Sequence, residues 1–462
     1  MQCRFWRAGL PTCRVRALLL VKESGNLPHS GEAADKLDED GPCAIPRISS
    51  RRLRSRVRKQ EPAAEQKGDP MIYAGVDIAK ADHVIGAVDE TGAEAAKPMP
   101  FKNSEAGFER CVAWLESVAE SEDGVFVGME ATGHYWMACF AYLTAAGYRV
   151  CVVNPMQVRA MRSLKGMPGV KNDRVDAWLI AETLRQGDYD ETRLATDEVQ
   201  ALKQLTRYHQ GLKQELATVK TQAICVLDAY FPEYAGLFSD MFGSASLKVL
   251  AECPTPSEVE RRRAATIAKL LSEGSRGRFG EAKAAQVKAA AKSSVGIRLG
   301  EDAASFQLKT MVSQIEFLNR TIAKVEREVA ALLEEIEPNI TTIPGVSTTT
   351  GAQIVAEIGD VRRFGSAASI VKYAGLNSGV DESGKFSAQG VPITKHGSPY
   401  LRRSLWLAAN RARQHDDRLR EFYEKKRREG KPHRVAVTAV ARKLCHIVYA
   451  VMRDGEPYDP AK

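Results

Sequence analysis

The feature that most limits what this chain can fold into is a regular alternation of strand-like and helix-like segments over residues 71–153. Short runs of β-branched and aromatic residues predict strands, and apolar residues that recur every three or four positions predict helices. In chain order these are strands at Met71–Asp77, His83–Asp89 and Pro98–Lys102, a helix at Ser104–Val118, a strand at Val125–Glu130, a helix at Gly133–Ala146 and a strand at Tyr148–Val153. The pattern predicts a mixed α/β domain built on one sheet.

Three strands in a meander, followed by helix, strand, helix and strand, is the order typical of an RNase H-like sheet. Two of the predicted strands end in an acid, Asp77 and Glu130. In α/β folds, ligands bind at the carboxyl ends of the strands. We therefore expect both carboxylates at a functional edge of the sheet.

A second pair of acids, Asp173 and Asp176, begins a predicted helix. Residues three apart project from the same face of a helix, so the two carboxylates can converge, although like charges that close repel each other. Two interpretations of this pair alone stay open. It either holds a divalent cation, which prefers oxygen ligands, or it is a solvated helix N-terminus, where acids suit the helix dipole and Arg174 supplies an ion pair.

The four acids together are more specific than either pair. An RNase H-like sheet brings its first strand, its fourth strand and a following helix to one edge. Asp77, Glu130, Asp173 and Asp176 therefore predict a site for one or two Mg²⁺ ions, with Mn²⁺ as the substitute. Two such ions can stabilise both the attacking and the leaving oxygen of an in-line phosphoryl transfer. The alternative is four unrelated surface acids.

Basic residues gather in two further places, where they suggest contacts with a phosphate backbone. One is the segment Met156–Val170, predicted to be a loop, with the residue just beyond it. The other is the start of a helix predicted over Thr394–Asn410. The residues concerned are Arg159, Arg162, Lys165, Lys171, Lys395, Arg402 and Arg403. For the first group the alternative is a solvated connection, and for each residue of the second group alone a solvated helix charge is an equally good interpretation.

Beyond residue 202 the apolar residues alternate steps of three and four, first over Leu202–Val226 and again over Leu308–Ile336. A heptad pattern sustained over this length predicts a coiled coil. The two arms pair either within the chain, as an antiparallel hairpin, or with a second subunit. Residues 230–300 separate the arms and are predicted to form a small helical insertion at the tip of the hairpin.

These features divide the chain into domains at 71–195, 196–337 and 338–462. Residues 1–70 lack periodicity and are expected to be a disordered basic extension, either an arm for nucleic acid or a non-native segment before a translation start at Met71. In the third domain, Ile343–Gly359 resembles a helix-hairpin-helix, which presents backbone N–H groups to phosphate, or is an ordinary tight turn. A polar, glycine-bearing loop follows at Asp381–Gly390.

Composition narrows the cellular setting. The formal net charge is +8, but residues 1–70 hold 14 Lys/Arg and 9 Asp/Glu, so the rest of the chain has only a weak bias toward polyanions. Nine cysteines without a C-x-x-C pair favour a reducing cytoplasm over zinc sites or disulfides. No stretch approaches the ~20 apolar residues that span a bilayer. We expect a cytoplasmic protein with no membrane partner.

Several motifs make the chain recognisable: Gly75–Lys80, Met129–Gly133, Asn154–Pro155 and Lys171–Ala177. They resemble the N-terminal domain of the DEDD transposases of the insertion-sequence 110 family, whose catalytic domain is similar to the RuvC Holliday-junction resolvase. The stretch from Ile343 to Arg403 resembles the same family's C-terminal transposase domain. The matches cover most of residues 71–455 and leave out residues 1–70 and the insertion.

The resemblance implies more than the residues show by themselves. The family's serine nucleophile lies in the polar loop after a Tyr-Ala-Gly-Leu segment, here Tyr373–Leu376, which implies Ser383; Ser378 and Ser387 are nearby competitors. Members are recombinases guided by a structured bridge RNA, and they pair double-stranded target and donor DNA. They assemble as dimers that join into tetramers, in which the RuvC-like domain of one subunit works with the serine domain of another.

Three functions follow in order of preference. The first is a transposase or site-specific recombinase that uses Mg²⁺ and Ser383. The second is a RuvC-like metal-dependent nuclease that cuts with water and forms no covalent link, so that Ser383→Ala would still cleave. The third is a non-catalytic, nucleic-acid-binding coiled-coil scaffold, in which Asp77→Ala and Asp176→Ala would leave function intact.

Overall fold

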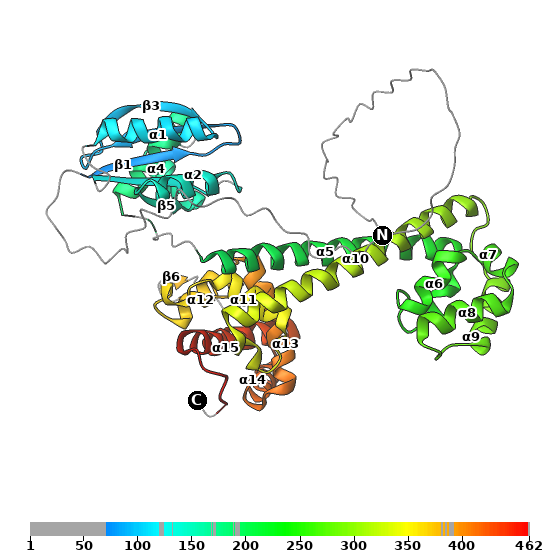
Figure 1. Ribbon diagram of the computed structural model, residues 1–462. Helices are drawn as coiled ribbons and strands as arrows, with labels where there is room; N and C mark the ends of the chain where they lie inside the picture. Colours follow the sequence, from blue (N-terminus) through cyan, green and yellow to red (C-terminus); the bar gives the residue numbers. More distant parts are fainter. Residues whose placement is uncertain are drawn as a thin grey trace, which may run out of the picture.

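The computed structural model describes residues 71–119, 124–131, 133–167, 169, 172–187, 189, 195–379, 382–383, 386–387 and 392–460. Residues 1–70, for which a basic extension is predicted, lie outside the described residues. The described chain has a five-stranded sheet with its helices in the N-terminal part and a largely helical remainder (Figure 1). The buried hydrophobic residues of these two parts form separate clusters. The predicted combination of an α/β part with a helical part is confirmed.

The sheet has the strand order β3-β2-β1-β4-β5. Its strands are β1 (Ile72–Asp77), β2 (Asp82–Val88), β3 (Glu94–Lys102), β4 (Val125–Glu130) and β5 (Arg149–Val153). The first three form an antiparallel meander, while β4 runs parallel to β1 and β5 runs parallel to β4. All five lie where the sequence predicts them, and only β3 begins clearly earlier than expected.

Helices cover both faces of the sheet. One face packs with α1 (Glu105–Val118) and α2 (Trp136–Ala145), in a cluster that includes Val76 and Met129. The other face packs with α3 (Pro155–Leu164) and α4 (Asp173–Arg185), in a cluster that includes Phe126. Because successive side chains of a strand point to opposite faces, residues one position away from Val76 and Met129 belong to the α4 face.

A row of three glycines lets α4 lie directly on the sheet. Gly86 of β2, Gly75 of β1 and Gly128 of β4 stand side by side in the pairing of the three strands. A Cβ atom on Gly75 would overlap the carbonyl oxygen of Ala177, and one on Gly128 would stand 2.6 Å from Cδ1 of Leu184. At Gly86 the nearest atom would be 3.6 Å away, an ordinary contact. The glycines of β1 and β4 therefore determine how closely α4 approaches.

The prediction of a basic loop over Met156–Val170 is wrong for the first part of this segment, which forms the helix α3. The helix begins with a capping box: the Asn154 side chain accepts a hydrogen bond from the N–H of Met156, and Gln157 bonds back to the N–H of Asn154. Pro155 occupies the first helical position, where a missing N–H has no cost. Arg159 and Arg162 are therefore helical, and Lys165 caps the helix end.

The two heptad segments form the long helices α5 (Asp197–Tyr230) and α10 (Glu301–Ile336). They pack against each other within the chain as an antiparallel hairpin (Figure 1): Nε2 of His209 lies 2.9 Å from Oε1 of Glu326 near one end, and Ile297 donates to the carbonyl of Ala229 at the other. Their buried stripes are Leu202, Thr206, His209, Leu212, Leu216, Val219, Ala223 and Leu227 on α5, and Leu308, Val312, Ile315, Leu318, Ile322, Val325, Val329 and Leu333 on α10.

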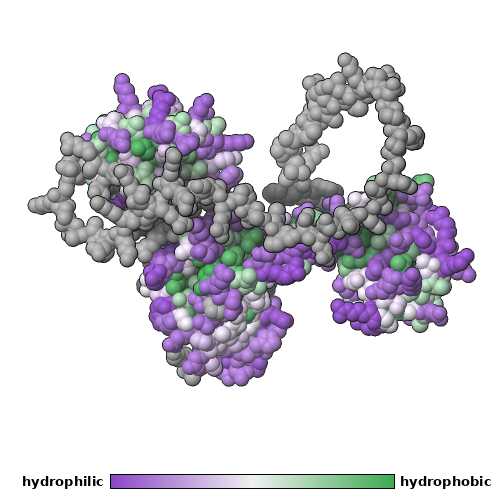
Figure 2. Space-filling view, in the orientation of Figure 1, coloured by the Kyte–Doolittle hydropathy of each residue, from purple (hydrophilic) through white to green (hydrophobic). Residues whose placement is uncertain are grey.

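Residues 230–300 are helical, as predicted, and form a lobe at the tip of the hairpin. The lobe contains η3 (Pro232–Gly236), α6 (Ser244–Glu252), α7 (Pro256–Arg261), α8 (Ala264–Ser275) and α9 (Glu281–Lys292). Its buried residues, among them Tyr234 and Leu250, join the same hydrophobic cluster as the hairpin. Figure 2 shows hydrophilic residues over much of the visible surface of this lobe, at the right of the view.

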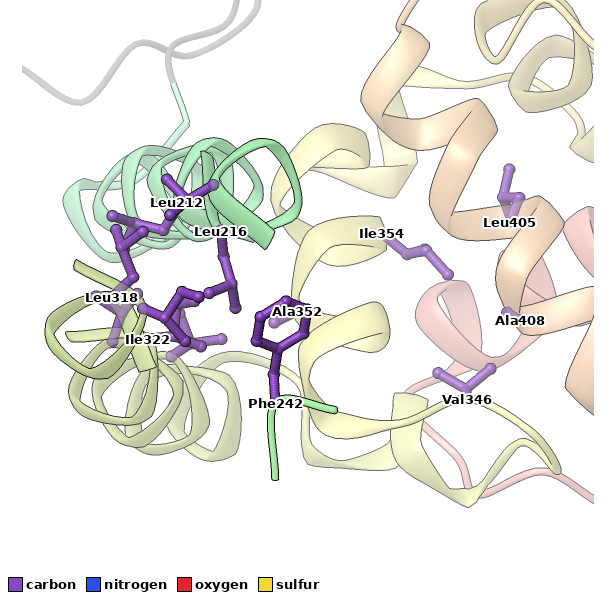
Figure 3. Close-up of a cluster of buried hydrophobic side chains, with 14 of the residues drawn as sticks. Leu212, Leu216, Phe242, Leu318, Ile322, Val346, Ala352, Ile354, Leu405 and Ala408 are labelled. Carbon is purple, nitrogen blue, oxygen red and sulfur yellow. The ribbon is translucent and has the colours of Figure 1, made fainter. Parts of the chain in front are cut away.

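The C-terminal helices pack against the other end of the hairpin. They are η4 (Pro338–Thr342), α11 (Thr348–Ile358), η5 (Val361–Arg363), α12 (Ala367–Tyr373), α13 (Pro399–His415), α14 (Asp417–Arg428) and α15 (His433–Asp454), with the two-stranded β6 (Glu382–Ser383) and β7 (Phe386–Ser387) after α12. Figure 3 shows hairpin leucines such as Leu216 beside Ala352 of α11, with Leu405 of α13 further on. The helix predicted from Thr394 begins instead at Pro399, where Ser398 caps it.

An ion pair between the half-exposed Arg207 and the buried Glu357 joins α5 to this C-terminal unit. Nε of Arg207 lies 2.7 Å from Oε1 of Glu357 in α11, and its Nη2 lies 3.1 Å from Oε2. The Glu357 side chain is fully buried and also accepts a hydrogen bond from Oγ of Ser398. The pair therefore joins α5, α11 and the start of α13.

Within the part of the chain that the structure describes, α15 is long and apolar enough to cross a membrane by length and composition. Its apolar residues, including Val440, Leu444 and Val448, are fully buried in the hydrophobic cluster of the C-terminal helices. In this fold α15 is thus a core helix.

Candidate active site

Asp77 and Glu130 end neighbouring parallel strands. β1 and β4 are paired with Val76 opposite Met129, so the next residue of each strand, Asp77 and Glu130, stands at the same edge of the sheet. Val76 and Met129 belong to the face packed with α1 and α2. By strand alternation both acids belong to the other face, which α4 covers. Both side chains are partly buried. As predicted, Asp77 and Glu130 thus stand at the ends of adjacent strands, at one edge of the sheet.

The two remaining acids occupy the first turn of α4. Asn172 caps this helix, since its side chain accepts a hydrogen bond from the N–H of Arg174. Asp173 is exposed, while Asp176 is partly buried and directly precedes Ala177, the residue packed on Gly75. The helix therefore brings Asp176 close to β1.

The contacts of Arg185, on the opposite side of α4, indicate which side of the helix bears Asp176. Arg185 donates to the carbonyl of Glu90 and lies near Gly92, in the turn that ends beside the start of β1. Asp176 is nine residues earlier in the helix, which is half a turn around the axis at about 100° per residue. Asp176 thus lies on the side of α4 toward the carboxyl end of β1, where Asp77 stands.

Arg162 and Lys165, predicted to contact phosphate, are engaged with acids of α4. Arg162 forms a short ion pair with Asp176. Nζ of Lys165 lies 2.6 Å from Oε1 of the buried Glu182, which also pairs with Arg185. The hydrogen bond from Arg185, assisted by the one from Lys165, lowers the pKa of Glu182 to about 2. Arg159 is exposed on α3, and Lys171 lies outside the described residues.

The donor types at this corner suit Mg²⁺, because all four predicted ligands are carboxylates. Among the described residues, however, no three His, Cys, Asp or Glu side chains are close enough to hold a metal ion together. Mg²⁺ is commonly bound by one or two carboxylates, waters and the oxygens of a phosphate substrate rather than by a complete protein cage. The pair at the strand ends, Asp77 and Glu130, fits that mode of binding.

Ser383 lies in β6, where its backbone pairs with Phe386 of β7. The base of this short ribbon is anchored in the C-terminal unit: Ser378 bridges to Ile393, and Gly379 donates to the carbonyl of Pro392. Arg442 of α15 donates to the carbonyl of Leu376 and to Oγ of Ser378. Residues 376–379 and 392–393, which flank the serine loop, therefore form a support within the C-terminal unit. Arg442 belongs to this support, and its position in the sequence gives no signal of that role.

The three basic residues predicted in the C-terminal unit differ in their surroundings. Arg402 donates to the backbone carbonyls of Ala374 and Lys395, so its guanidinium ties α13 to the end of α12. Lys395 is exposed and has a left-handed backbone with φ of 56°. Arg403 is also exposed. Lys395 and Arg403 are accessible to a phosphate backbone, whereas Arg402 is largely occupied within the fold.

Sequence comparison divides the chain in the same way as its fold. Residues 74–232 match the DEDD family named for IS110 and described as transposase, and residues 337–424 match the transposase IS116/IS110/IS902 family. The first match spans the sheet, its helices and α5, and the second spans most of the C-terminal unit. The tip of the hairpin and α10 lie between the two matches.

Similar proteins cover most of this chain and nearly all of their own length. The 42 kDa protein of insertion element IS900 from Mycobacterium paratuberculosis is 26% identical over 407 residues, which are 84% of this chain and 98% of that protein. The 43.6 kDa protein of insertion element IS110 from Streptomyces coelicolor is 24% identical over 85% of this chain and 96% of its own length. A pilin gene-inverting protein of Moraxella lacunata is 22% identical over 84% and 97%.

Proposed function

Since the chain belongs to the IS110 family of transposases, we propose that it cuts and rejoins the DNA of an insertion sequence with a carboxylate-bound Mg²⁺ and a serine nucleophile. Asp77 and Glu130 would hold the metal at the sheet edge, Asp173 and Asp176 would have to approach them from the first turn of α4 when the metal binds, and Ser383 would attack the scissile phosphate. The observation that carries the proposal is the placement of Asp77 and Glu130 at neighbouring strand ends, on the face covered by the helix that bears Asp176.

Each group in this proposal has a distinct task. Bound Mg²⁺ neutralises charge on the phosphate and on the oxygens that attack and leave. A serine hydroxyl is a poor nucleophile at its free pKa, so Ser383 needs a phosphate whose negative charge is already offset. Attack of its Oγ on phosphorus breaks the bond to one DNA oxygen and leaves a phosphoserine link. The released DNA hydroxyl of a second strand can then displace the serine and rejoin the backbone.

Several features of the proposal rest on the resemblance to the family. We propose double-stranded DNA at the element ends and the target as substrate, a structured guide RNA as the source of sequence choice, and a cytoplasmic, nucleoid-associated location. We also propose a dimer that pairs into a tetramer, with Ser383 delivered by one subunit to the acids of another. The RNase H/RuvC-like assignment of the sheet domain is supported by its strand order and by the helices on both faces.

A recombination assay tests the chemistry. The gene and its element ends are supplied on plasmids in a host that lacks the element, and junction formation is counted by sequencing. Asp77→Asn, Glu130→Gln and Asp176→Asn should each reduce junctions by about a hundredfold or more, while protein level and melting temperature stay near those of the wild type. Junction formation at wild-type frequency in any two of these variants would show that these carboxylates take no part in the reaction.

The serine step separates recombination from cleavage with water. Purified Ser383→Ala should fail to cut labelled element DNA, and wild-type protein quenched in denaturant should carry a covalently attached DNA strand. Ser387→Ala, on the neighbouring strand of the same ribbon, is the matched control and should still cut. Cutting by Ser383→Ala with no protein-linked DNA in the wild type would favour a metal-dependent nuclease.

A further inference from the structure

We propose that a groove between α4 and the strands β2 and β3 holds an unpaired base of single-stranded DNA, stacked on Trp178. The groove has a volume of about 600 Å³, within the range of roughly 300–1,000 Å³ in which proteins bind small-molecule-sized groups. Its walls come from β3 on one side and from α4 on the other. This inference rests on the proposed function, because that function identifies the ligand as a strand of DNA. It places that DNA strand in a groove beside Asp77 and Glu130.

A β-bulge shapes the sheet side of the groove. In the pairing of β2 with β3, two residues, Lys97 and Pro98, stand opposite the single residue Gly86. The pairs on either side are Ile85 with Met99 and Ala87 with Ala96. Two residues opposite one make a bulge, which re-aims side chains and is common beside functional sites. Here both bulged residues, including the cation Lys97, line the groove.

The floor of the groove is a glycine. A Cβ atom on Gly86 would stand 3.6 Å from Cγ of Pro98 and 3.7 Å from Cβ of Ala177. Gly86 therefore sits between the bulge and the start of α4, and its missing side chain keeps the space between them open. Gly75 and Gly128 serve the close packing of α4, whereas Gly86 contributes to a cavity.

The helix wall supplies an aromatic ring and a cation. Arg174 and Trp178 are four residues apart, so they lie on the same side of α4, and both line the groove. Trp178 is partly exposed, and Nζ of Lys165 lies 5.5 Å from the centre of its ring. A partly exposed indole in a groove offers a flat surface for a base, and such stacking tolerates any sequence because every base has an aromatic face.

The charges of the groove favour the phosphates that flank such a base. Lys97 and Arg174 are exposed, and neither side chain makes a hydrogen bond or ion pair within the part of the chain that the structure describes. Glu94 is the acid among the lining residues, so two cations face one carboxylate. Backbone-tracking cations beside an aromatic platform are the combination that binds single strands. A purely apolar protein segment would leave Lys97 and Arg174 without partners.

The groove and the acidic corner share α4. Asp176 and Trp178 are two residues apart and project from different sides of the helix, because each residue turns by about 100°. A strand whose base is held on Trp178 would pass the first turn of α4 to reach Asp77 and Glu130. Holding a base out of its duplex next to the cutting site would keep the scissile strand in place.

Fluorescence anisotropy with a labelled oligothymidylate, in EDTA and at fixed salt, tests the groove. Trp178→Leu keeps an apolar side chain but removes the aromatic face, so it should weaken binding about tenfold, in line with the alanine-substitution cost of a stacked base. Trp178→Phe should bind nearly as well as the wild type. Trp114→Leu, on α1 and the opposite face of the sheet, is the control for loss of an indole and should bind as the wild type does.

Two further arms test the charges and the ligand. Lys97→Gln and Arg174→Gln should each reduce the slope of log affinity against log salt by about 0.7, and Lys102→Gln, an exposed cation at the end of β3, should not. An abasic oligonucleotide should bind the wild type about as weakly as oligothymidylate binds Trp178→Leu.

Equal oligothymidylate binding by Trp178→Leu and the wild type would overturn the proposal, as would an equal loss of affinity for duplex DNA or for the matching RNA in Trp178→Leu. Because the assay contains no divalent metal, it does not depend on cleavage. Asp176→Asn should lose recombination and keep oligonucleotide binding, so failure of the groove and failure of the proposed chemistry give different results.

Discussion

Arg162 of α3 donates a hydrogen bond to a carboxylate oxygen of Asp176 in α4, and the two side chains are only 16% and 15% exposed. The guanidinium thus offsets, from within the chain, part of the repulsion between acids gathered at one corner of the sheet. A divalent cation bound at that corner would compete with Arg162 for Asp176.

This competition predicts how Arg162→Ala will respond to Mg²⁺. In EDTA the variant should lose roughly 1–3 kcal/mol of unfolding free energy, because a partly buried carboxylate is left without its partner. Added Mg²⁺ should restore more stability to the variant than it adds to the wild type. Urea unfolding with and without Mg²⁺ measures both effects. Arg159→Ala, an exposed arginine of the same helix, is the control, and an equal Mg²⁺ response in Arg162→Ala and wild type would contradict the competition.

The glycine row predicts a sharp difference between neighbouring substitutions. Gly75→Ala should cost about 3 kcal/mol or more of unfolding free energy, since its Cβ would overlap the backbone of α4 and force the helix away from the sheet. Gly86→Ala should cost little, because its Cβ would meet only ordinary contacts. Chemical denaturation of both variants checks this, and similar stabilities would show that α4 does not depend on Gly75.

Glu182 predicts a loss of stability in acid. Its folded pKa is lowered to about 2, against about 4.3 for an unperturbed glutamate. As the pH falls, the unfolded chain takes up this proton first, so the stabilisation is complete above about pH 4.5 and disappears between about pH 4.5 and 2. The loss from this group is on the order of 3 kcal/mol. Glu182→Gln should flatten the dependence of unfolding free energy on pH in that window, while the exposed Glu105→Gln should not.

The pair between Arg207 and Glu357 predicts an asymmetric double-mutant cycle. Arg207→Ala leaves a fully buried carboxylate without its cation and should cost about 3–5 kcal/mol. Glu357→Gln, which keeps a hydrogen-bonding group beside Ser398, should cost less. The double variant should be more stable than Arg207→Ala alone, because the uncompensated charge is gone. Additive losses, measured by urea unfolding, would show that the two residues act independently.

The sheet could be predicted from local pattern because each strand has its own run of apolar residues and Asp77 and Glu130 directly follow two of them. The helix α3 is not predicted, because its basic residues suggest a loop on a phosphate backbone. The sequence nevertheless contains a signal for the start of a helix. Asn154, Pro155 and Gln157 form the capping box and first turn of a helix, and that combination is readable in a sequence.

Other features depend on contacts between distant segments. The alignment of Gly75 with Gly128 and the bulge opposite Gly86 appear only once strand register is known. The predicted heptad pattern is right in kind but differs in detail: the stripe of α5 is predicted to end at Val226, whereas the buried stripe includes Thr206 and ends at Leu227. α5 meets α11 as well as α10, so its buried surface is wider than a two-helix seam. Asp77 and Glu130 could be placed at one edge of the sheet from the sequence, but the Arg162–Asp176 pair could not be foreseen.

The hairpin buries the apolar stripes of both of its helices within one chain. Because the apolar stripes of α5 and α10 are buried against each other inside one chain, they are closed to a partner. Any side-by-side docking of two copies through α10 would have to use its outer ridge instead, where Phe306 and Phe317 are 75% and 59% exposed and lie about three turns apart on one side. Exchange of hairpin arms between copies would first require both copies to open.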